Sequence, residues 1–129
     1  MKTILVDTLY CFTSEIGEIF TEMYSILETY PNRKILLTNA NDEQFTAWKL
    51  YMMPYELFTL KHKPEKTDPT YFKKMLEHFD LLSTDVVYFE HNSKAVEAAK
   101  TVGICSYYYN SQIKDLCALK EFLDESLKR

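Results

Sequence analysis

The sequence predicts an α/β fold in which a five-stranded, mainly parallel sheet lies between two layers of helices. Short apolar runs rich in β-branched residues recur five times along the 129 residues. After each run, apolar residues recur at spacings of three and four, which is typical of a helix with one buried face. Strands that alternate with helices favour a parallel sheet covered on both sides, so we predict a three-layer α/β/α sandwich.

The individual elements follow from the same two patterns and from capping residues. Strands are expected at residues 3–7, 34–37, 56–60, 85–89 and 104–108. Helices are expected at about 14–27, 42–51, 69–79 and 93–102, and from 113 to the C-terminal region. Ser14 is the expected N-cap of the first helix, with Gly17 inside it, while Gly103 is placed to end the fourth helix.

Length and composition favour one globular domain that spans residues 1–129. The net charge of −4 argues against a nucleic-acid-binding surface, which is usually basic. The sequence has no apolar run long enough for a transmembrane helix and no signal peptide pattern, so we expect no membrane partner. Three scattered cysteines are typical of reduced thiols, which predicts a cytoplasmic location.

Polar residues follow four of the predicted strands. Asp7 ends the first strand, Thr38 and Asn39 follow the second, Lys63 lies in the loop after the third, and Glu90 follows the fourth. Ligands of open α/β sheets bind beyond the carboxyl ends of the strands. We therefore expect these side chains to converge on one site.

Two common α/β families do not account for this pattern. A dinucleotide-binding unit needs a glycine-rich first turn, and both glycines of this chain lie elsewhere. A bacterial receiver domain needs an Asp after the third strand, where this chain has Leu60 to Lys63.

The order of Asp, Thr, Lys-Pro and acid resembles the haloacid dehalogenase-like (HAD) superfamily over the whole core. Residues 3–7 resemble its first motif and residues 35–39 its second. Lys63-Pro64, followed by residues 68–72, resembles the third motif. Residues 86–92, continued through the helix to Gly103-Ile104, resemble the fourth and are the most specific part of the match. About twenty-five residues separate the first two motifs, so the resemblance implies a member without the inserted cap domain.

This resemblance implies phosphoryl transfer assisted by Mg²⁺. Asp7 would be the nucleophile that forms an aspartyl-phosphate, and Asp7 and Glu90 would bind the metal. Thr38, Asn39 and Lys63 would hold the phosphate of a small phosphorylated compound, with Lys63 also supplying positive charge to the reaction.

Other positions depart from the superfamily pattern. Leu9 stands where active phosphatases carry a second Asp as general acid, and His91 and Ala95 stand where the fourth motif has acids. Two hypotheses follow. The chain is a phosphohydrolase with weakened or unusual activity, or it is an inactive module that binds a phosphorylated ligand or a protein partner. A site without a cap is open, and a homodimer is one way to cover it.

Each candidate residue also has a purely structural interpretation. Asp7 at a strand end can accept hydrogen bonds from loop amides, and Thr38 and Asn39 can cap the following helix. Lys63 and Glu90 can be solvated loop residues. The arrangement in space decides between these interpretations.

Overall fold

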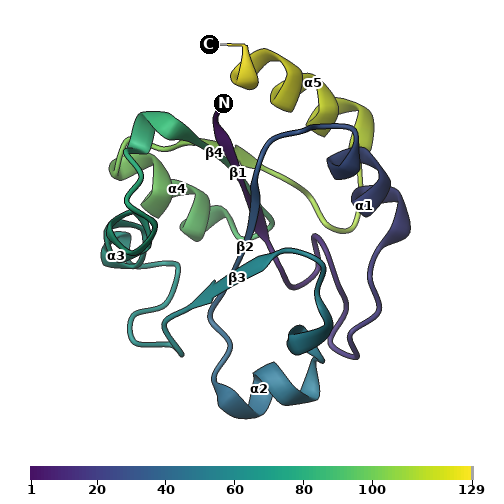
Figure 1. The fold of residues 1–129 in the computed structure, drawn as a ribbon, viewed down its shortest axis with the longest axis vertical. Helices are drawn as coiled ribbons and strands as arrows, with labels where there is room; N and C mark the ends of the chain where they lie inside the picture. The colour runs from purple at the N-terminus through teal and green to yellow at the C-terminus, as the bar shows by residue number, and fades with distance from the viewer. Residues whose placement is uncertain (129) are drawn as a thin grey trace.

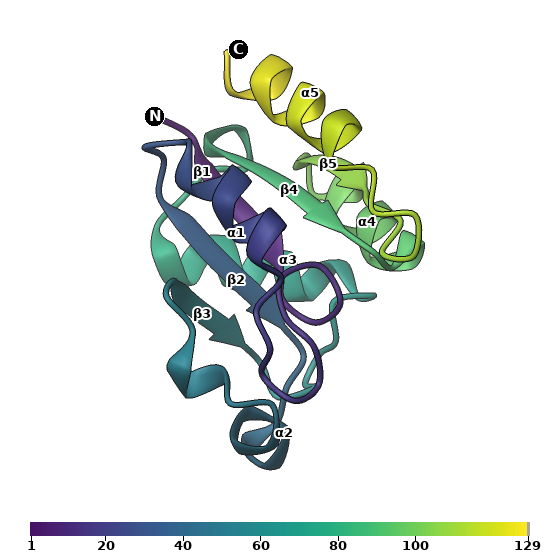
Figure 2. The same cartoon turned by 90° about the vertical axis from the view of Figure 1, so that its right-hand side faces the viewer.

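The five strands form one parallel sheet in the order β3-β2-β1-β4-β5, as a computed structural model describes it for residues 1–128. The strands are β1 (Thr3–Asp7), β2 (Lys34–Thr38), β3 (Glu56–Thr59), β4 (Val86–Glu90) and β5 (Cys105–Tyr108). β1, which ends on Asp7, therefore lies between the strands that end at Thr38 and Glu90. Five strands, all paired in parallel, confirm the predicted sheet (Figure 2).

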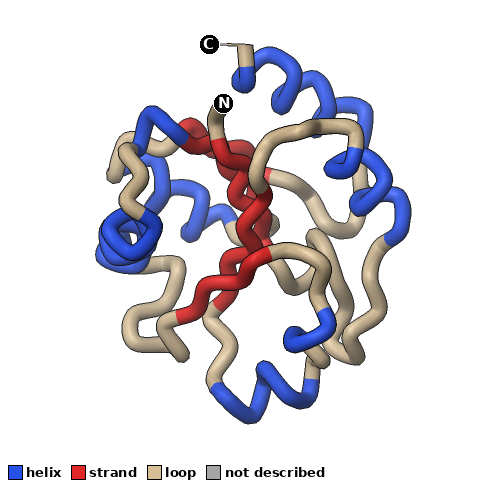
Figure 3. The backbone as a smooth tube through the Cα atoms, viewed as in Figure 1, coloured by secondary structure: helices blue, strands red, loops and turns tan. Residues whose placement is uncertain are grey.

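Helices cover both faces of the sheet (Figures 1 and 3). The helices are α1 (Thr21–Glu28), α2 (Asp42–Ala47), α3 (Pro69–Phe79), α4 (Ser93–Thr101) and α5 (Leu116–Leu127), with short 3₁₀ turns at Leu50–Met52 and Ser83–Asp85. α3 and α4 lie on one side of the sheet, and α1 and α5 lie on the other (Figure 1). α2 lies beyond the end of β2, away from both faces.

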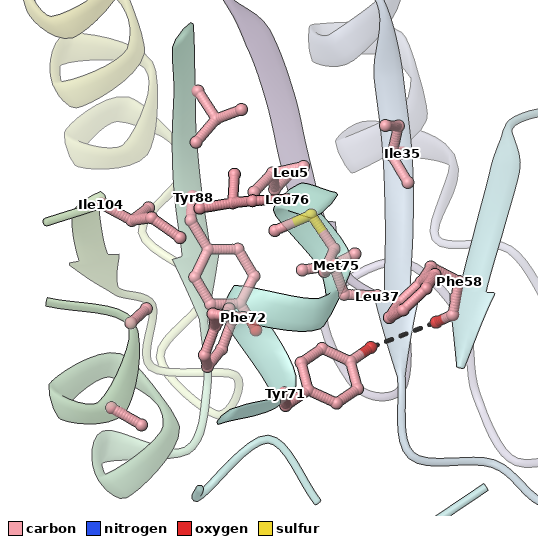
Figure 4. Close-up of a cluster of buried hydrophobic side chains, with 13 residues drawn as sticks. Leu5, Ile35, Leu37, Phe58, Tyr71, Phe72, Met75, Leu76, Tyr88 and Ile104 are labelled. Carbon is pink, nitrogen blue, oxygen red and sulfur yellow. Dashed lines mark hydrogen bonds between the residues drawn. The ribbon is translucent and has the colours of Figure 1, made fainter. Parts of the chain in front are cut away.

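Alternation of side chains along the buried strands produces a separate core on each face. On the α3/α4 face, Leu5, Leu37 and Tyr88 pack against Phe72 and Met75 of α3 (Figure 4). The opposite core joins the alternate residues of the same strands to α1 and α5: Ile4, Val6, Leu36, Val87, Phe89, Met23, Leu27, Leu119 and Leu123. Complete burial of one large apolar side chain stabilises the fold by about 1.5–3 kcal/mol, so both layers of helices are firmly attached.

Short polar side chains fix where three of the helices begin. The Asn41 side chain accepts from Gln44 N at 2.9 Å in a capping box, so Asn41 rather than Asn39 caps α2. Asp68 caps α3 with Pro69 at the first helical position, and Asn92 caps α4. α2 is shorter than expected because Lys49 adopts a positive φ of 53°, after which the chain forms a 3₁₀ turn.

The prediction of a first helix from residue 14 is wrong, because residues 8–20 form a loop of tight turns and α1 begins only at Thr21. Gly17 has a φ of +80°, which is incompatible with a helix interior. Ser14 Oγ accepts from the amides of Ile16 and Glu18 inside this loop and caps no helix. Ile16, the first residue of the apolar series that predicted this helix, is 69% exposed. The start of the series therefore does not mark a buried face.

Among the described residues, none of the helices combines the length and the apolar character that crossing a membrane requires. All three cysteines are free, with Cys11 buried and the other two exposed.

Candidate active site

The register of the central strands brings Asp7 and Glu90 side by side. β1 and β4 pair with Val6 opposite Phe89, so the two acids are the next residues along each strand. Both side chains point to the α3/α4 face, because Leu5 and Tyr88, two residues earlier, are in the core on that face. Asp7 and Glu90 are both completely or almost completely buried. Two buried carboxylates at adjacent strand ends require nearby positive charge.

Lys66 supplies that charge. Its Nζ lies 2.6 Å from Asp7 Oδ1 and 2.8 Å from Glu90 Oε1, and its side chain is only 8% exposed. One ammonium group therefore contacts both acids. Two carboxylates about 10 Å apart could not share one cation, and these two lie far closer together than that. Tyr88 Oη also donates to Glu90 Oε1.

The sequence analysis assigned this position to Lys63, and the structure corrects it. Lys63 is exposed and lines a different surface hollow beside Asp42 and Leu60. Lys66 lies where the chain turns back toward α3, two residues before its N-cap Asp68. The backbone amide of Lys66 donates to Asn39 Oδ1 at 2.8 Å, which directs the lysine toward the strand ends.

The other oxygen of Asp7 is surrounded by donors. Asp7 Oδ2 accepts from the backbone amide of His91 at 3.1 Å and from Cys11 Sγ at 3.2 Å, and it also bonds to His91 Nδ1. His91 Nδ1 lies 3.2 Å from Glu90 Oε2. Both oxygens of Asp7 are thus held in place, one by Lys66 and the other by the start of the β4–α4 connection.

Charges within this group shift its pKa values in opposite directions. Burial acts to raise the pKa of Asp7, but the positive charge of Lys66 and the hydrogen bond from His91 outweigh it and hold that pKa far below the usual range. Burial acts to lower the pKa of His91, but its bonds to Asp7 and Glu90 raise it to about 9. The pKa of Lys66 is raised by the two acids despite its burial. At neutral pH, Asp7 is therefore ionised and both Lys66 and His91 are charged.

Thr38 and Asn39 lie at the end of the neighbouring strand β2. Thr38 is buried, and its Oγ1 accepts from Ala40 N at 3.2 Å. Its backbone amide and carbonyl both bond to Tyr71 Oη of α3, at 3.2 and 2.9 Å. This contact fixes the end of β2 against the helix that follows Lys66.

These residues line one pocket of about 240 Å³ at the carboxyl ends of the strands. Its wall includes the acids and cations described above and also Thr38, Asn39, Leu9, Trp48, His62 and Ala95. The volume is below the 300–1,000 Å³ of a typical drug-sized ligand site, so the pocket suits a small ligand.

Comparison with solved structures identifies the architecture. The core domain of a candidate phosphoglycolate phosphatase from Streptococcus pneumoniae matches with a TM-score of 0.57 and 18% identity, over 84% of this chain and 79% of that domain. A candidate β-phosphoglucomutase from Thermotoga maritima matches with a TM-score of 0.56 and 16% identity, over 84% of this chain and 85% of that chain.

A HAD-superfamily hydrolase of subfamily IA from Geobacter sulfurreducens matches with a TM-score of 0.54 and 16% identity, over 67% of this chain and 44% of that protein. The match thus spans less than half of the Geobacter protein. The chain has the HAD-like fold. No model of a known protein family and no curated protein matches the sequence.

The HAD-like fold accounts for the positions that the motifs predicted. The first, second and fourth strands of the resemblance are β1, β2 and β4, and the loop before α3 supplies the lysine. The connection from β1 to β2 holds the single helix α1 in place of an inserted domain. Leu9 and Ala95 line the pocket with apolar atoms at positions where the HAD-like motifs carry acids.

Sequence reasoning missed two residues of this site. The Lys63-Pro64 pair favours Lys63, although Lys66 lies nearer to Asp68, the N-cap of α3. Cys11 lies in the connection before the expected first helix, and no neighbouring residue in the sequence indicates an activated thiolate there. The spacing Asp7-x₃-Cys11 right after a buried strand was the available signal.

The residues around Asp7 do not fit the Mg²⁺ ion that the HAD-like resemblance implied. Mg²⁺ prefers an octahedral set of oxygen ligands. Here the imidazole nitrogen of His91 lies between Asp7 Oδ2 and Glu90 Oε2, and the next donor is the sulfur of Cys11. Nitrogen and sulfur atoms thus hold the positions that water and carboxylate oxygens would need to take.

Proposed function

We propose that this protein is a phosphohydrolase that acts on a small phosphate monoester through an aspartyl-phosphate at Asp7. The observation that carries the proposal is the buried Lys66, whose ammonium group joins Asp7 and Glu90 on the wall of a pocket that Thr38 and Asn39 also line. The fold and the order of these residues along the chain support the same reaction class.

In the proposed reaction, an oxygen of Asp7 attacks the phosphorus atom and the bond to the leaving-group oxygen breaks. Lys66 offsets the negative charge that gathers around the transferred group, and Thr38 and Asn39 contribute hydrogen bonds to its oxygens. A water molecule then hydrolyses the aspartyl-phosphate, which releases inorganic phosphate and restores the carboxylate.

Leu9 restricts the substrates that such a site can use. An apolar side chain cannot give a proton to the departing oxygen, and loss of a positioned acid typically lowers the rate by about 10²–10⁴-fold. The favoured substrates are therefore compounds whose leaving group is stable as an anion. The pocket of about 240 Å³ limits them further to small molecules.

The proposed reaction does not include Mg²⁺, because the donors beside Asp7 do not fit that ion. Lys66 supplies positive charge on one side of Asp7, and His91 lies on the other. A cytoplasmic setting and a homodimer that covers the open site stay predictions from the sequence.

The first experiment measures hydrolysis of p-nitrophenyl phosphate, whose leaving group needs no proton. We expect turnover that is lost in Asp7→Asn and kept in Asp42→Asn, a control whose carboxylate is 84% exposed in α2. Turnover that is indifferent to the Asp7 substitution would overturn the assignment. A series with added Mg²⁺ tests the metal directly, since strong stimulation would mean that the ion displaces His91.

The second candidate function is an inactive module that binds a phosphorylated ligand. Two observations favour it, namely the apolar Leu9 and the hydrogen bonds that engage both oxygens of Asp7. Calorimetry with inorganic phosphate separates the two functions. Binding without any turnover, weakened by Lys66→Met and unchanged by Lys63→Met, would assign the binding role.

A further inference from the structure

Three potential metal ligands of different chemistry meet beside β1. The atoms Asp7 Oδ2, Cys11 Sγ and His91 Nδ1 all lie within 4.8 Å of one another. Two of these residues are buried, and His91 is 27% exposed on its side chain. We propose that they form a binding site for a divalent cation of the Zn²⁺ class, which goes beyond the proposed function and does not depend on it.

The donor set determines the class of metal. A thiolate and an imidazole select Zn²⁺ and neighbouring transition metals, whereas Mg²⁺ and Ca²⁺ select oxygen ligands. One carboxylate, one imidazole and one thiolate resemble in number the three protein ligands of catalytic zinc sites, which leave a fourth position open. The cation takes the place of two protons, which pass to solvent: the Sγ proton that Cys11 donates to Asp7 Oδ2 and the Nδ1 proton of His91. A further carboxylate oxygen, Glu90 Oε2, lies 3.2 Å from His91 Nδ1.

Distances between the ligand atoms approach those of a tetrahedral site. With zinc bonds of about 2.3 Å to sulfur and about 2.0–2.1 Å to nitrogen and oxygen, the ligand atoms lie roughly 3.2–3.7 Å apart. Asp7 Oδ2 and Cys11 Sγ are already 3.2 Å apart. His91 Nδ1 bonds directly to Asp7 Oδ2, so the ring must withdraw slightly to admit the ion, and its partial exposure leaves room for that rotation.

The backbone holds Cys11 in this position before any metal binds. Thr8 O accepts from the amides of Phe12 and Thr13, both at 3.0 Å, and Tyr10 N donates to Thr13 O at 2.8 Å. This closed turn starts immediately after Asp7, so it places the thiol four residues later against the same carboxylate. Such preorganisation lowers the entropic cost of assembling three ligands around an ion.

Partners outside the ligand set hold the ligands in orientation. Lys66 binds the other oxygen of Asp7, and the backbone amide of His91 binds Asp7 Oδ2 itself. Outer partners of this kind orient metal ligands and typically change metal affinity by 10–100-fold. Access is also present, because Asp7 and His91 line the site pocket, while Cys11 lines an adjoining hollow of about 530 Å³.

Co²⁺ is the probe that tests this site without an activity assay. The full chain is freed of metal with a chelator, which is then removed, and titrated with Co²⁺. We expect one equivalent to produce a thiolate-to-cobalt charge-transfer absorption together with the visible bands of a tetrahedral ion. Zn²⁺ should then abolish both signals at one equivalent, and excess Mg²⁺ should leave them unchanged.

Two variants and a matched control assign the ligands. Cys11→Ser should lose the charge-transfer absorption, while Cys117→Ser, which changes an exposed cysteine of α5, should keep it. His91→Asn alters a partly exposed side chain and should weaken Co²⁺ binding by more than the 10–100-fold typical of an outer partner. Circular dichroism shows that each variant is folded.

The proposal is overturned if wild-type protein gives no charge-transfer absorption, or if a folded Cys11→Ser variant keeps it. Should Cys11→Ser fail to fold, His91→Asn decides alone, and wild-type affinity in that variant would overturn the site. None of these readouts uses phosphate ester hydrolysis, so failure of the metal site and failure of the proposed enzyme are seen separately.

Discussion

The two connections that leave the centre of the sheet differ in length and in how they are built. The β4–α4 connection is residues 91–92 alone, and Asn92 caps the helix at once. The β1–α1 connection takes residues 8–20, folded back on themselves by hydrogen bonds to Thr8 O. Both deliver a side chain to the same carboxylate, His91 from the short connection and Cys11 from the long one.

This difference shows how much local sequence can determine. In the short connection, one capping residue fixes the backbone, so the position of His91 follows from the register of β4. In the long connection, the position of Cys11 depends on a closed turn, and Gly17 of the same connection lies against Trp48 and Lys49, far along the chain. Four substitutions or conditions test the comparison, starting with the largest expected effect.

Removal of the lysine that ties both strand ends together should destabilise the protein most. Lys66→Met leaves Asp7 and Glu90 as two buried carboxylates without their shared cation. We expect a loss of about 3–5 kcal/mol in the free energy of unfolding, measured by urea denaturation. Lys63→Met should change it by less than about 0.5 kcal/mol, because Lys63 is exposed. Equal effects of the two variants would contradict the assignment of Lys66.

The next substitution breaks the long connection. In Gly17→Ala, the new Cβ would lie 2.8 Å from Lys49 Cβ and 2.9 Å from Trp48 O, at a φ of +80°. We expect a loss of about 1–3 kcal/mol in thermal or urea denaturation. If residues 14–27 formed one helix, the same change would instead stabilise the protein by up to about 1 kcal/mol. The sign of the effect therefore distinguishes the loop from the helix.

A pH series examines the imidazole of the short connection. The pKa of His91 is raised from 6.5 to about 9 in the folded protein, so the folded state binds its proton more tightly. The stabilisation of the folded state by the His91 proton is complete below pH 6.5, falls as the pH rises from there, and is absent above about 9. We expect a decline of about 1–2 kcal/mol in urea denaturation with a chelator present, less than the full shift implies because the ring is partly exposed.

His91→Asn provides the control for this series, because asparagine does not titrate in that range. Its stability should change less across the same pH values than that of the wild type. Parallel curves for the two proteins would mean that His91 does not carry the dependence.

The smallest effect concerns the cap of α4. The Asn92 side chain accepts from Lys94 N at 2.9 Å, so Asn92→Ala should cost about 1 kcal/mol in the free energy of unfolding. Ser93→Ala, at the next position, should stay within about 0.5 kcal/mol. The reverse result would make Ser93 the cap and lengthen the connection by one residue.

The centre of the sheet was predictable because β1, β2 and β4 are buried on both faces. Apolar runs such as residues 3–7 and 86–89 indicate a strand without help from the rest of the chain. The position of Asp7 at the end of β1 can be predicted from the first of these runs alone. About half of the site was predictable. The positions of Asp7, Thr38, Asn39 and Glu90 follow from where the strands end, and strand ends can be predicted from the sequence. Lys66 depends on a loop anchored by Asn39, a contact across 27 residues that no local pattern records.

Apolar spacing failed where the backbone adopts positive φ. Ile16, Ile19 and Phe20 follow a helical spacing, yet Gly17 turns the chain between them and leaves Ile16 in solvent. A glycine inside an expected helix was the signal that could have broken the pattern before the structure was known.

The charge balance at the end of β1 affects how fast an anion can reach the pocket. In the metal-free chain, two carboxylates face two cations, Lys66 and His91, so the group as a whole is close to neutral. The protein itself carries a net charge of −4. A phosphorylated ligand therefore approaches without long-range attraction, and its association rate should rise slightly, or stay level, as salt screens the protein. Recognition then depends on contacts made after arrival, and affinity is set by how long the complex lasts.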